Sequence, residues 1–213
     1  LLSTSRLLGQ TVAAVVVGVA GATSDLAPLL LAGVAAAVGG AISMALGEYV
    51  SVSSQRDTER ALIEHERREI EEDPDGELAQ LAGIYEAKGL TPATARRVAL
   101  ELTERDPLAA HVEAELGLDP DARTNPWHAA LASAIAFTLG AALPLGAMVL
   151  APAAARIPVT VAAVIVALAV TGSVSAWFGR AHRLRAVVRL LVGGALAMGV
   201  TWAVGSLVGA TVL

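Results

Sequence analysis

Several acidic side chains in the middle of the chain are spaced so that they could bind a cation. Glu66 and Glu69 are three residues apart in a segment expected to be helical, so both carboxylates point to the same side and can share one ion. Glu77 and Gln80 repeat this spacing in the next predicted helix. Without a cation, neighbouring carboxylates repel each other. The spacing therefore indicates a site for a divalent metal ion.

A histidine and another glutamate extend this candidate set. His111 precedes Glu115 by about one helical turn, which places an imidazole beside a carboxylate. Both groups are ligands of divalent transition metals. The alternative is that the acidic helix faces are simply solvated, as most are, and that His65 and His111 are surface histidines.

A methionine and a glutamate form a second candidate position. Met44 lies one turn before Glu48 on the same face of an apolar helix, near the end of that helix. An ionisable residue at a membrane boundary is a candidate for function. Equally, Glu48 can reach interfacial water and Met44 can serve in packing alone.

The distribution of charge separates an acidic middle from apolar flanks. The chain has 213 residues, of which 55% are hydrophobic, and every Asp and Glu except Asp25 lies between Glu48 and Asp121. This region attracts cations and repels nucleic acid, so we expect divalent metal ions as partners and no nucleic acid. The absence of cysteine excludes disulfides and thiolate zinc sites. An oxygen-rich site favours Fe(II), Mn(II), Mg(II) or Ca(II).

Five apolar segments are predicted to cross a lipid bilayer. A spanning helix needs about 20 mostly apolar residues. The approximate bounds are residues 7–22, 26–50, 127–150, 158–177 and 184–212. Because a spanning backbone must satisfy its own hydrogen bonds, we predict an all-α membrane protein. Its expected domains are membrane helices one and two in residues 1–50, an acidic helical metal-binding insert in residues 51–125, and membrane helices three to five in residues 126–213.

The insert is predicted to consist of consecutive helices. Beyond Glu48 the second apolar segment continues without Gly or Pro as far as Pro74, which predicts one long helix. A short helix follows Asp75 and ends at Gly89, and Thr91 caps the next one. Residues 106–117 form the last short helix.

Arginine placement predicts the orientation in the membrane. Cytoplasmic loops retain positive charge. The loop between the fourth and fifth segments contains Arg180, Arg183, Arg185 and Arg189. We therefore expect a multi-pass protein of the cell membrane with its N-terminus and acidic insert in the cytoplasm.

Long stretches of the sequence resemble the vacuolar iron transporter family in its bacterial form. These stretches are GGAISMALGEYVSVSSQRDTE, ERRE, ELAQLAGIYEAKGL, DPLAAHVEAELGLDP, NPWHAALASAIAFTLGAALPL and GGALAMGVTWAVG. The resemblance implies five membrane helices, a homodimer, and export of Fe(II), often with Mn(II), from the cytosol in exchange for protons. The metal is then the bound and transported ion, with no prosthetic group. No nucleophile, base and orienting group occur together, so we do not expect an enzyme.

The resemblance also assigns residues. It places the metal-binding glutamates of the insert at Glu66, Glu69, Glu77 and Glu115. A fifth glutamate of the family falls at Gln80, and a methionine pair falls at His111 and Val112. Met44 matches a methionine of the translocation path, which leads to a vestibule formed by Met44 and Glu48 between two protomers.

Two departures from the family pattern bear on function. Gln80 keeps an amide oxygen but brings no charge. In the first segment, Leu7 and Leu8 stand where the family has an Asp-Gly pair, and no carboxylate precedes Asp25. This second departure bears on proton coupling and motivates an alternative, a metal-binding membrane sensor or scaffold that does not transport. A further alternative is a small-solute carrier whose acidic insert only aids solubility.

Overall fold

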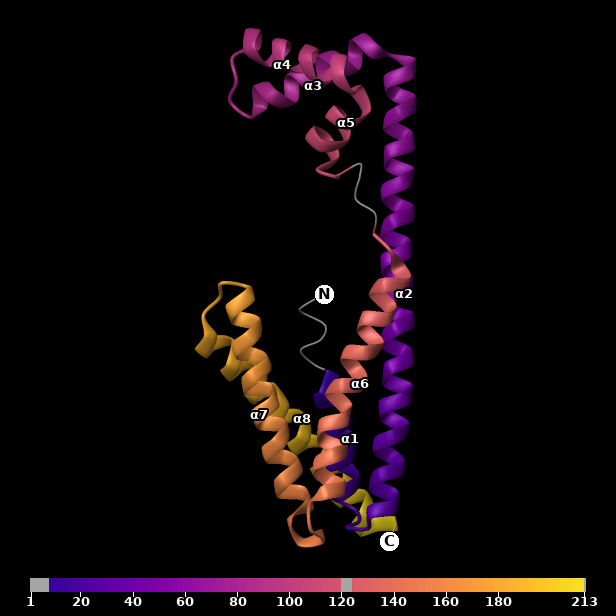
Figure 1. Ribbon diagram of the computed structural model, residues 1–213, viewed down its shortest axis with the longest axis vertical. Coiled ribbons are helices and arrows are strands. Elements are labelled where there is room, and N and C mark those ends of the chain that lie inside the picture. The colour runs from indigo at the N-terminus through magenta and orange to yellow at the C-terminus, as the bar shows by residue number, and fades with distance from the viewer. Residues whose placement is uncertain (1–7, 120–123, 213) are drawn as a thin grey trace. The chain divides into compact units, whose positions relative to one another are not determined.

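The computed structural model describes residues 8–119 and 124–212 (Figure 1). Within these residues all regular structure is helical and no strand occurs, which confirms the predicted all-α class. The chain divides into two compact units, one made by the residues before position 50 and after position 126, and one made by residues 50–126. We refer to them as the membrane unit and the insert unit.

The described residues of the membrane unit form five helices and a short 3-10 turn. They are α1 (Leu8–Ala20), the first part of α2 (Leu26–Glu72), α6 (Pro126–Leu150), η3 (Ala153–Ala155), α7 (Arg156–Phe178) and α8 (Arg183–Val212). Among the described residues, α2, α6, α8 and α7 with its preceding turn are long and apolar enough to cross a bilayer. The protein is therefore a multi-pass membrane protein. At 13 residues, α1 is shorter than the first predicted span.

The short helix α1 is covered by its neighbours. On one side, Val12 and Val16 pack in a core cluster that includes Phe137 of α6. On another side, Ala13 and Val17 pack in a second cluster formed with α7 and α8. Contacts on several sides explain why α1 is mostly apolar although it is short.

Small residues bring α1 and α8 into backbone contact. A Cβ added at Gly205 of α8 would overlap the carbonyl oxygen of Gly18 in α1, and one added at Gly209 would lie 2.7 Å from the Cα of Ala22. Close approach through small residues at four-residue spacing is common between membrane helices, where packing drives association. Glycine at these positions is therefore a packing requirement.

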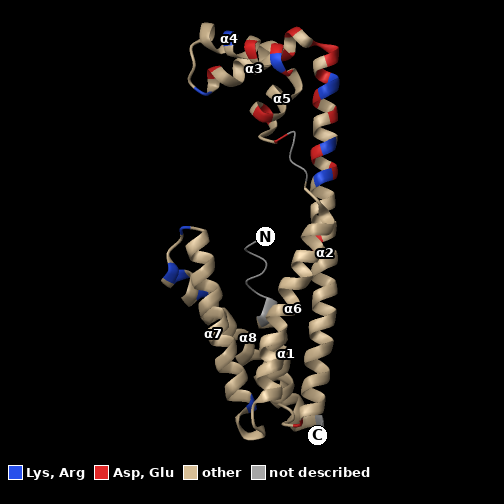
Figure 2. Ribbon diagram, in the orientation of Figure 1, with Lys and Arg blue, Asp and Glu red and all other residues tan. Residues whose placement is uncertain are grey.

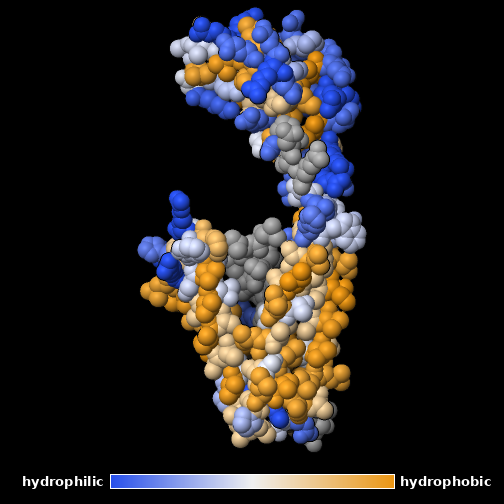
Figure 3. Space-filling model, in the orientation of Figure 1, coloured by the Kyte–Doolittle hydropathy of each residue, from blue (hydrophilic) through white to orange (hydrophobic). Residues whose placement is uncertain are grey.

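Helix α2 is one continuous helix of 47 residues, as the absence of Gly and Pro between Glu48 and Pro74 predicted. Its apolar first part belongs to the membrane unit, and its charged second part belongs to the insert unit. Figure 2 shows charged residues along the ribbon of this second part, and Figure 3 shows the predominantly apolar surface of the membrane unit.

As far as the insert unit is described, it also contains three short helices and a π-helical turn: α3 (Pro74–Ala87), α4 (Pro92–Arg105), α5 (Pro107–His111) and η2 (Val112–Leu116). Thr91 caps α4 as predicted. Helix α3 was predicted to follow Asp75, but it begins at Pro74 with Asp73 as its cap, and Asp75 lies in its first turn. The last predicted helix divides into α5 and the π-helical η2, which ends at Gly117 with φ +63°. Leu81 and Ala99 lie at the centre of a small core that joins these pieces.

Candidate metal-binding site

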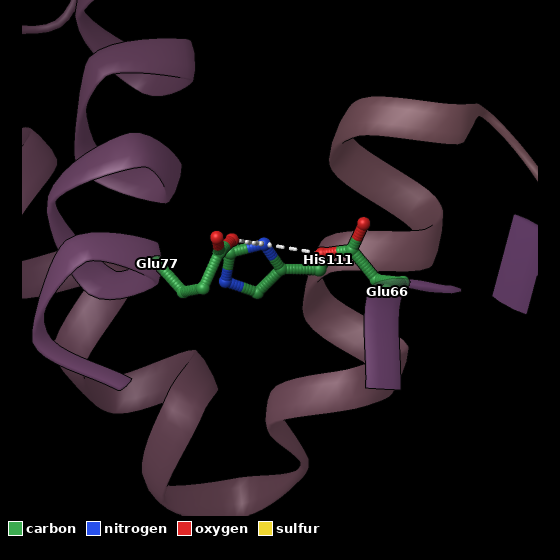
Figure 4. Close-up of side chains that lie close together, drawn as sticks. All are labelled: Glu66, Glu77 and His111. Carbon is green, nitrogen blue, oxygen red and sulfur yellow. Dashed lines mark ion pairs between the residues drawn. The ribbon is translucent and has the colours of Figure 1, made fainter. Parts of the chain in front are cut away.

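Three side chains from three helices of the insert unit converge on one point. They are Glu66 of α2, Glu77 of α3 and His111 of α5, and their ligand atoms all lie within 4.8 Å of one another. His111 Nδ1 is 3.0 Å from Glu66 Oε1 and 3.5 Å from Glu77 Oε2. Figure 4 shows the two carboxyl groups and the imidazole ring close together.

Local capping explains how the chain brings Glu66 and Glu77 together. Helix α2 ends at Glu72, and the Asp73 side chain accepts a hydrogen bond of 3.0 Å from the Gly76 N–H, which starts α3. The chain thus changes direction over a single residue. Glu66 and Glu77 lie on the two sides of this break, so their side chains can meet.

His111 is placed by the start and the end of α5. Asp106 caps α5 by accepting a hydrogen bond of 2.9 Å from the Ala109 N–H. His111 is the last residue of α5, and the π-helical turn η2 follows directly. Single π-helical turns are rare and occur frequently at functional sites. Here the turn follows the imidazole and carries Glu115.

Glu66 and His111 of the cluster are buried, Glu77 is partly buried, and the facing atoms form no hydrogen bond within the described residues. Glu66 is 3% exposed and His111 is 1% exposed. Burial of His111 contradicts the alternative in which it is a surface histidine. Among the described residues, Glu66 Oε1, Glu77 Oε2 and His111 Nδ1 have no hydrogen-bond partner. Because buried polar atoms normally have partners, this convergence indicates a place for a ligand.

Burial also changes the ionisation of these groups. Desolvation, together with the nearby carboxylates of Glu115, Glu77 and Glu69, raises the pKa of Glu66 to about 7. Burial likewise raises the pKa of Glu77, with contributions from Glu69 and Glu115. Burial lowers the pKa of His111. At neutral pH the imidazole is therefore neutral, and a cation would stabilise the ionised form of Glu66.

The remaining predicted residues of the insert lie around this cluster or beside it. Gln80 Nε2 donates a hydrogen bond of 2.7 Å to Glu115 Oε2, which joins α3 to η2. Glu69 Oε1 lies 3.6 Å from His65 Nε2 on the same helix, and both side chains are partly exposed. Glu69, Gln80 and Glu115 are therefore not part of the buried triad, although the charges of Glu69 and Glu115 act on it.

The predicted residues of the membrane path lie in the other unit. Met44 is partly buried against the core formed with α1 and α6, and Glu48 is partly buried near the end of the membrane part of α2. Leu7 lies outside the described residues, and Leu8 begins α1. The sequence analysis missed Gln10, a polar side chain of α1 that is 7% exposed. Gln10 could have been recognised in the sequence as a polar residue inside an apolar segment.

Two carboxylates and one imidazole suit a divalent transition metal. Two ligand atoms bound to one ion at about 2.1 Å lie about 3.0–3.4 Å apart. The distances from His111 Nδ1 to Glu66 and Glu77 are of this size. The fold and the site thus define a multi-pass helical membrane protein with a candidate metal-binding cluster in its polar insert.

The sequence profile of the VIT family matches residues 10–206, so the chain belongs to the VIT family, as its motifs predicted. A vacuolar iron transporter of Acanthamoeba castellanii is 41% identical over 194 residues, which cover 90% of this chain and 74% of that protein. Vacuolar iron transporter homolog 2.1 of Arabidopsis thaliana is 32% identical over 95% of this chain and 77% of its own length. VIT-like transporter 1b of Glycine max is 32% identical over 95% of this chain and 72% of its own length.

Proposed function

We propose that this protein transports Fe(II), and Mn(II) as a second substrate, out of the cytosol in exchange for protons. The observation that carries the proposal is the cluster of Glu66, Glu77 and His111, whose facing atoms have no hydrogen-bond partner in the part of the chain that the structure describes. Membership in the VIT family supports it, since a relative that is 41% identical bears the name vacuolar iron transporter.

In this proposal the insert captures the metal. Glu66, Glu77 and His111 supply two oxygens and one nitrogen as ligands, which suits Fe(II) and Mn(II). Glu69, Gln80 and Glu115 surround these ligands. The two glutamates add carboxylates that attract the cation, and Gln80 adds an amide oxygen. Capture displaces the proton that Glu66 holds at low pH, because its pKa is about 7. Metal uptake by the insert is then linked to proton release.

The membrane unit provides the route. Its five helices act as five spans, since α1 is covered on several sides by longer helices and so needs less contact with lipid. Two protomers form a homodimer, and metal passes a vestibule formed by Met44 and Glu48 of each. Residues 51–125 are the metal-binding domain in the cytoplasm, where the arginines of the loop between α7 and α8 also lie. The protein resides in the cell membrane.

A second candidate function is a metal sensor or scaffold that binds metal without transporting it. The observation that favours it is α1, whose described residues contain no Asp or Glu. A neutral α1 offers no carboxylate to exchange a proton for the metal.

Reconstitution into liposomes separates the two candidates. Transport predicts Fe(II) or Mn(II) flux, with an opposite proton flux seen by a trapped pH dye. The double variant Glu66→Ala with Glu69→Ala reduces this flux, whereas the exposed pair Glu71→Ala with Glu72→Ala serves as a control with the same loss of charge. Binding without flux supports the sensor. Unchanged flux in the first variant rules out capture by these glutamates.

A further inference from the structure

We propose that the turn between α7 and α8 binds the phosphate headgroup of an anionic phospholipid. Four of the five described arginines of the membrane unit lie in this turn and the start of α8, at positions 180, 183, 185 and 189. None of them forms an ion pair with a carboxylate of the described residues, and the described carboxylates of this unit are Asp25 and Glu48. Figure 2 shows this basic end of the unit. The proposal does not depend on metal transport.

The backbone of the turn holds an arginine in an unfavourable conformation. The Ala181 N–H bonds to the Ala176 carbonyl at 2.9 Å and the Arg180 N–H to the Trp177 carbonyl at 3.4 Å, a helix-ending pattern whose left-handed position usually takes glycine. Arg180 occupies that position with φ +48°, and it is the one non-glycine residue with positive φ in the described chain. Strain of this kind is concentrated at functional sites. Arginine at this strained position is explained if its positive charge binds an anion.

The first turns of α8 place positive charge next to an apolar surface. Arg185 and Arg189 are four residues apart and share one exposed face. Beside that face runs a stripe of exposed apolar side chains at the same spacing, Leu184, Val188 and Val192. The N-terminus of a helix also carries partial positive charge and free N–H groups, which favour an anion. A phosphate that is joined through glycerol to acyl chains fits both the basic and the apolar surface, whereas a free phosphate fits only the basic one.

The depth of Arg189 argues for a lipid partner. It lies six residues beyond Arg183, which is about 9 Å along the helix. A charged side chain this far into a membrane helix needs a partner or must extend back to the headgroup region. Because no described carboxylate pairs with it, a lipid phosphate is the partner that the membrane itself supplies.

Two aromatic side chains mark the headgroup level at the end of α7. Trp177 and Phe178 are 63% and 61% exposed, and their ring centroids are 4.8 Å apart. Tryptophan favours the membrane interface because its ring is apolar and its N–H is polar. Aromatic rings, arginines and an apolar stripe therefore occur together at the α7–α8 end of the membrane unit, where Figure 3 shows polar surface next to apolar surface.

The test uses the full chain, purified in neutral detergent, and thermal unfolding. Phosphatidylglycerol at a hundred-fold excess over its Kd is expected to raise the unfolding midpoint by about 5 °C or more. Phosphatidylcholine and inorganic phosphate at the same concentration should change it by less than about 1 °C. The variant Arg185→Gln with Arg189→Gln should lose most of the lipid effect. The variant Arg96→Gln with Arg97→Gln, which removes two exposed charges from the insert, should keep it.

Three results would overturn the proposal: equal stabilisation by both lipids, equal stabilisation by inorganic phosphate, or an unchanged lipid effect in the Arg185 and Arg189 variant. If that variant does not fold, native mass spectrometry of the wild-type protein gives a second test. After exposure to an equal mixture of the two lipids, the protein should retain phosphatidylglycerol at least ten-fold in preference. Retention without preference contradicts a headgroup site.

Discussion

His111 Nδ1 lies 3.0 Å from Glu66 Oε1 in the interior of the insert unit, and neither atom has a hydrogen-bond partner among the described residues. The contact is not a full ion pair. Burial lowers the pKa of His111, so the imidazole is neutral at pH 7, and burial raises the pKa of Glu66 to about 7, so its carboxyl group is half protonated. A metal ion between them would act as the missing partner of both atoms.

Metal affinity should therefore depend on pH. Below pH 7 an ion must displace the proton of Glu66, so the affinity for Mn(II) should fall by about ten-fold for each pH unit. The raised pKa of Glu77 steepens this fall, whereas the lowered pKa of His111 keeps the imidazole available. Calorimetric titration at pH 6, 7 and 8 in buffers of different ionisation enthalpy measures both affinity and proton release. An affinity that is constant from pH 6 to 8 contradicts binding at Glu66.

Glu66→Gln should stabilise the metal-free insert while weakening metal binding. The folded-state pKa of about 7 exceeds the unfolded value of about 4.5, so the folded state holds an extra proton between these values. Stability is therefore lost as pH rises through this window and is lowest above pH 7. Glutamine does not ionise, so at pH 8 the variant should gain about 1–3 kcal/mol in the free energy of unfolding of the insert.

Thermal unfolding at pH 8 with a chelator measures this gain. His111 does not interfere at this pH, because its lowered pKa affects stability only below about 6.5. Glu71→Gln removes an exposed charge from the same helix and is the matched control, with little change expected. If Glu66→Gln lowers stability at pH 8, the ionised carboxylate is stabilised by a partner in the folded insert and is not destabilised by burial.

Gln80→Glu should have the opposite effects: it should destabilise the metal-free insert and strengthen metal binding. Gln80 Nε2 donates a hydrogen bond of 2.7 Å to Glu115 Oε2, and an ionised glutamate would repel that carboxylate. The metal-free insert should lose about 1 kcal/mol of stability, and the affinity for Mn(II) should rise by about ten-fold because a charged ligand is added. Unfolding with a chelator and titration with metal give the two values.

Gln55→Glu is a close control for this variant. Gln55 Nε2 also donates to a glutamate, Glu59 Oε1 at 2.8 Å, but on the exposed face of α2. The Gln55→Glu variant makes the same change of charge and also loses a hydrogen bond, but at a position outside the cluster. If both variants raise the affinity equally, the gain reflects overall charge and not a ligand at position 80.

The helices were largely predictable because their signals are local. Apolar runs predicted α6, α7 and α8 to within two residues, and the absence of Gly and Pro between Glu48 and Pro74 predicted that α2 continues beyond its apolar part. Thr91 followed by Pro92 marked the start of α4. The division of the last insert helix at His111 was not predictable, since a π-helical turn depends on packing and has no simple sequence signal.

The partners within the site depend on contacts between helices. Spacing along the sequence relates Glu66 to Glu69 and Glu77 to Gln80, because it describes only residues of one helix. The structure instead brings Glu66 to Glu77 and His111, and Gln80 to Glu115. These contacts follow from the change of direction at Asp73 and the docking of α5, which are tertiary features. Burial of His111 has the same origin.

Gly205→Ala tests the contact between α1 and α8. The added methyl group would overlap the carbonyl oxygen of Gly18, a backbone atom that cannot rotate away, so the two helices must separate. Such overpacking should destabilise the membrane unit by about 1–3 kcal/mol, measured by thermal unfolding in detergent. Gly199→Ala is the matched control on the same helix, because no described atom outside the adjacent backbone of α8 lies within 4 Å of its added Cβ. Since alanine is a better helix former than glycine, this control should leave stability unchanged or slightly raised. Equal effects of the two substitutions would show that α1 and α8 are not in backbone contact.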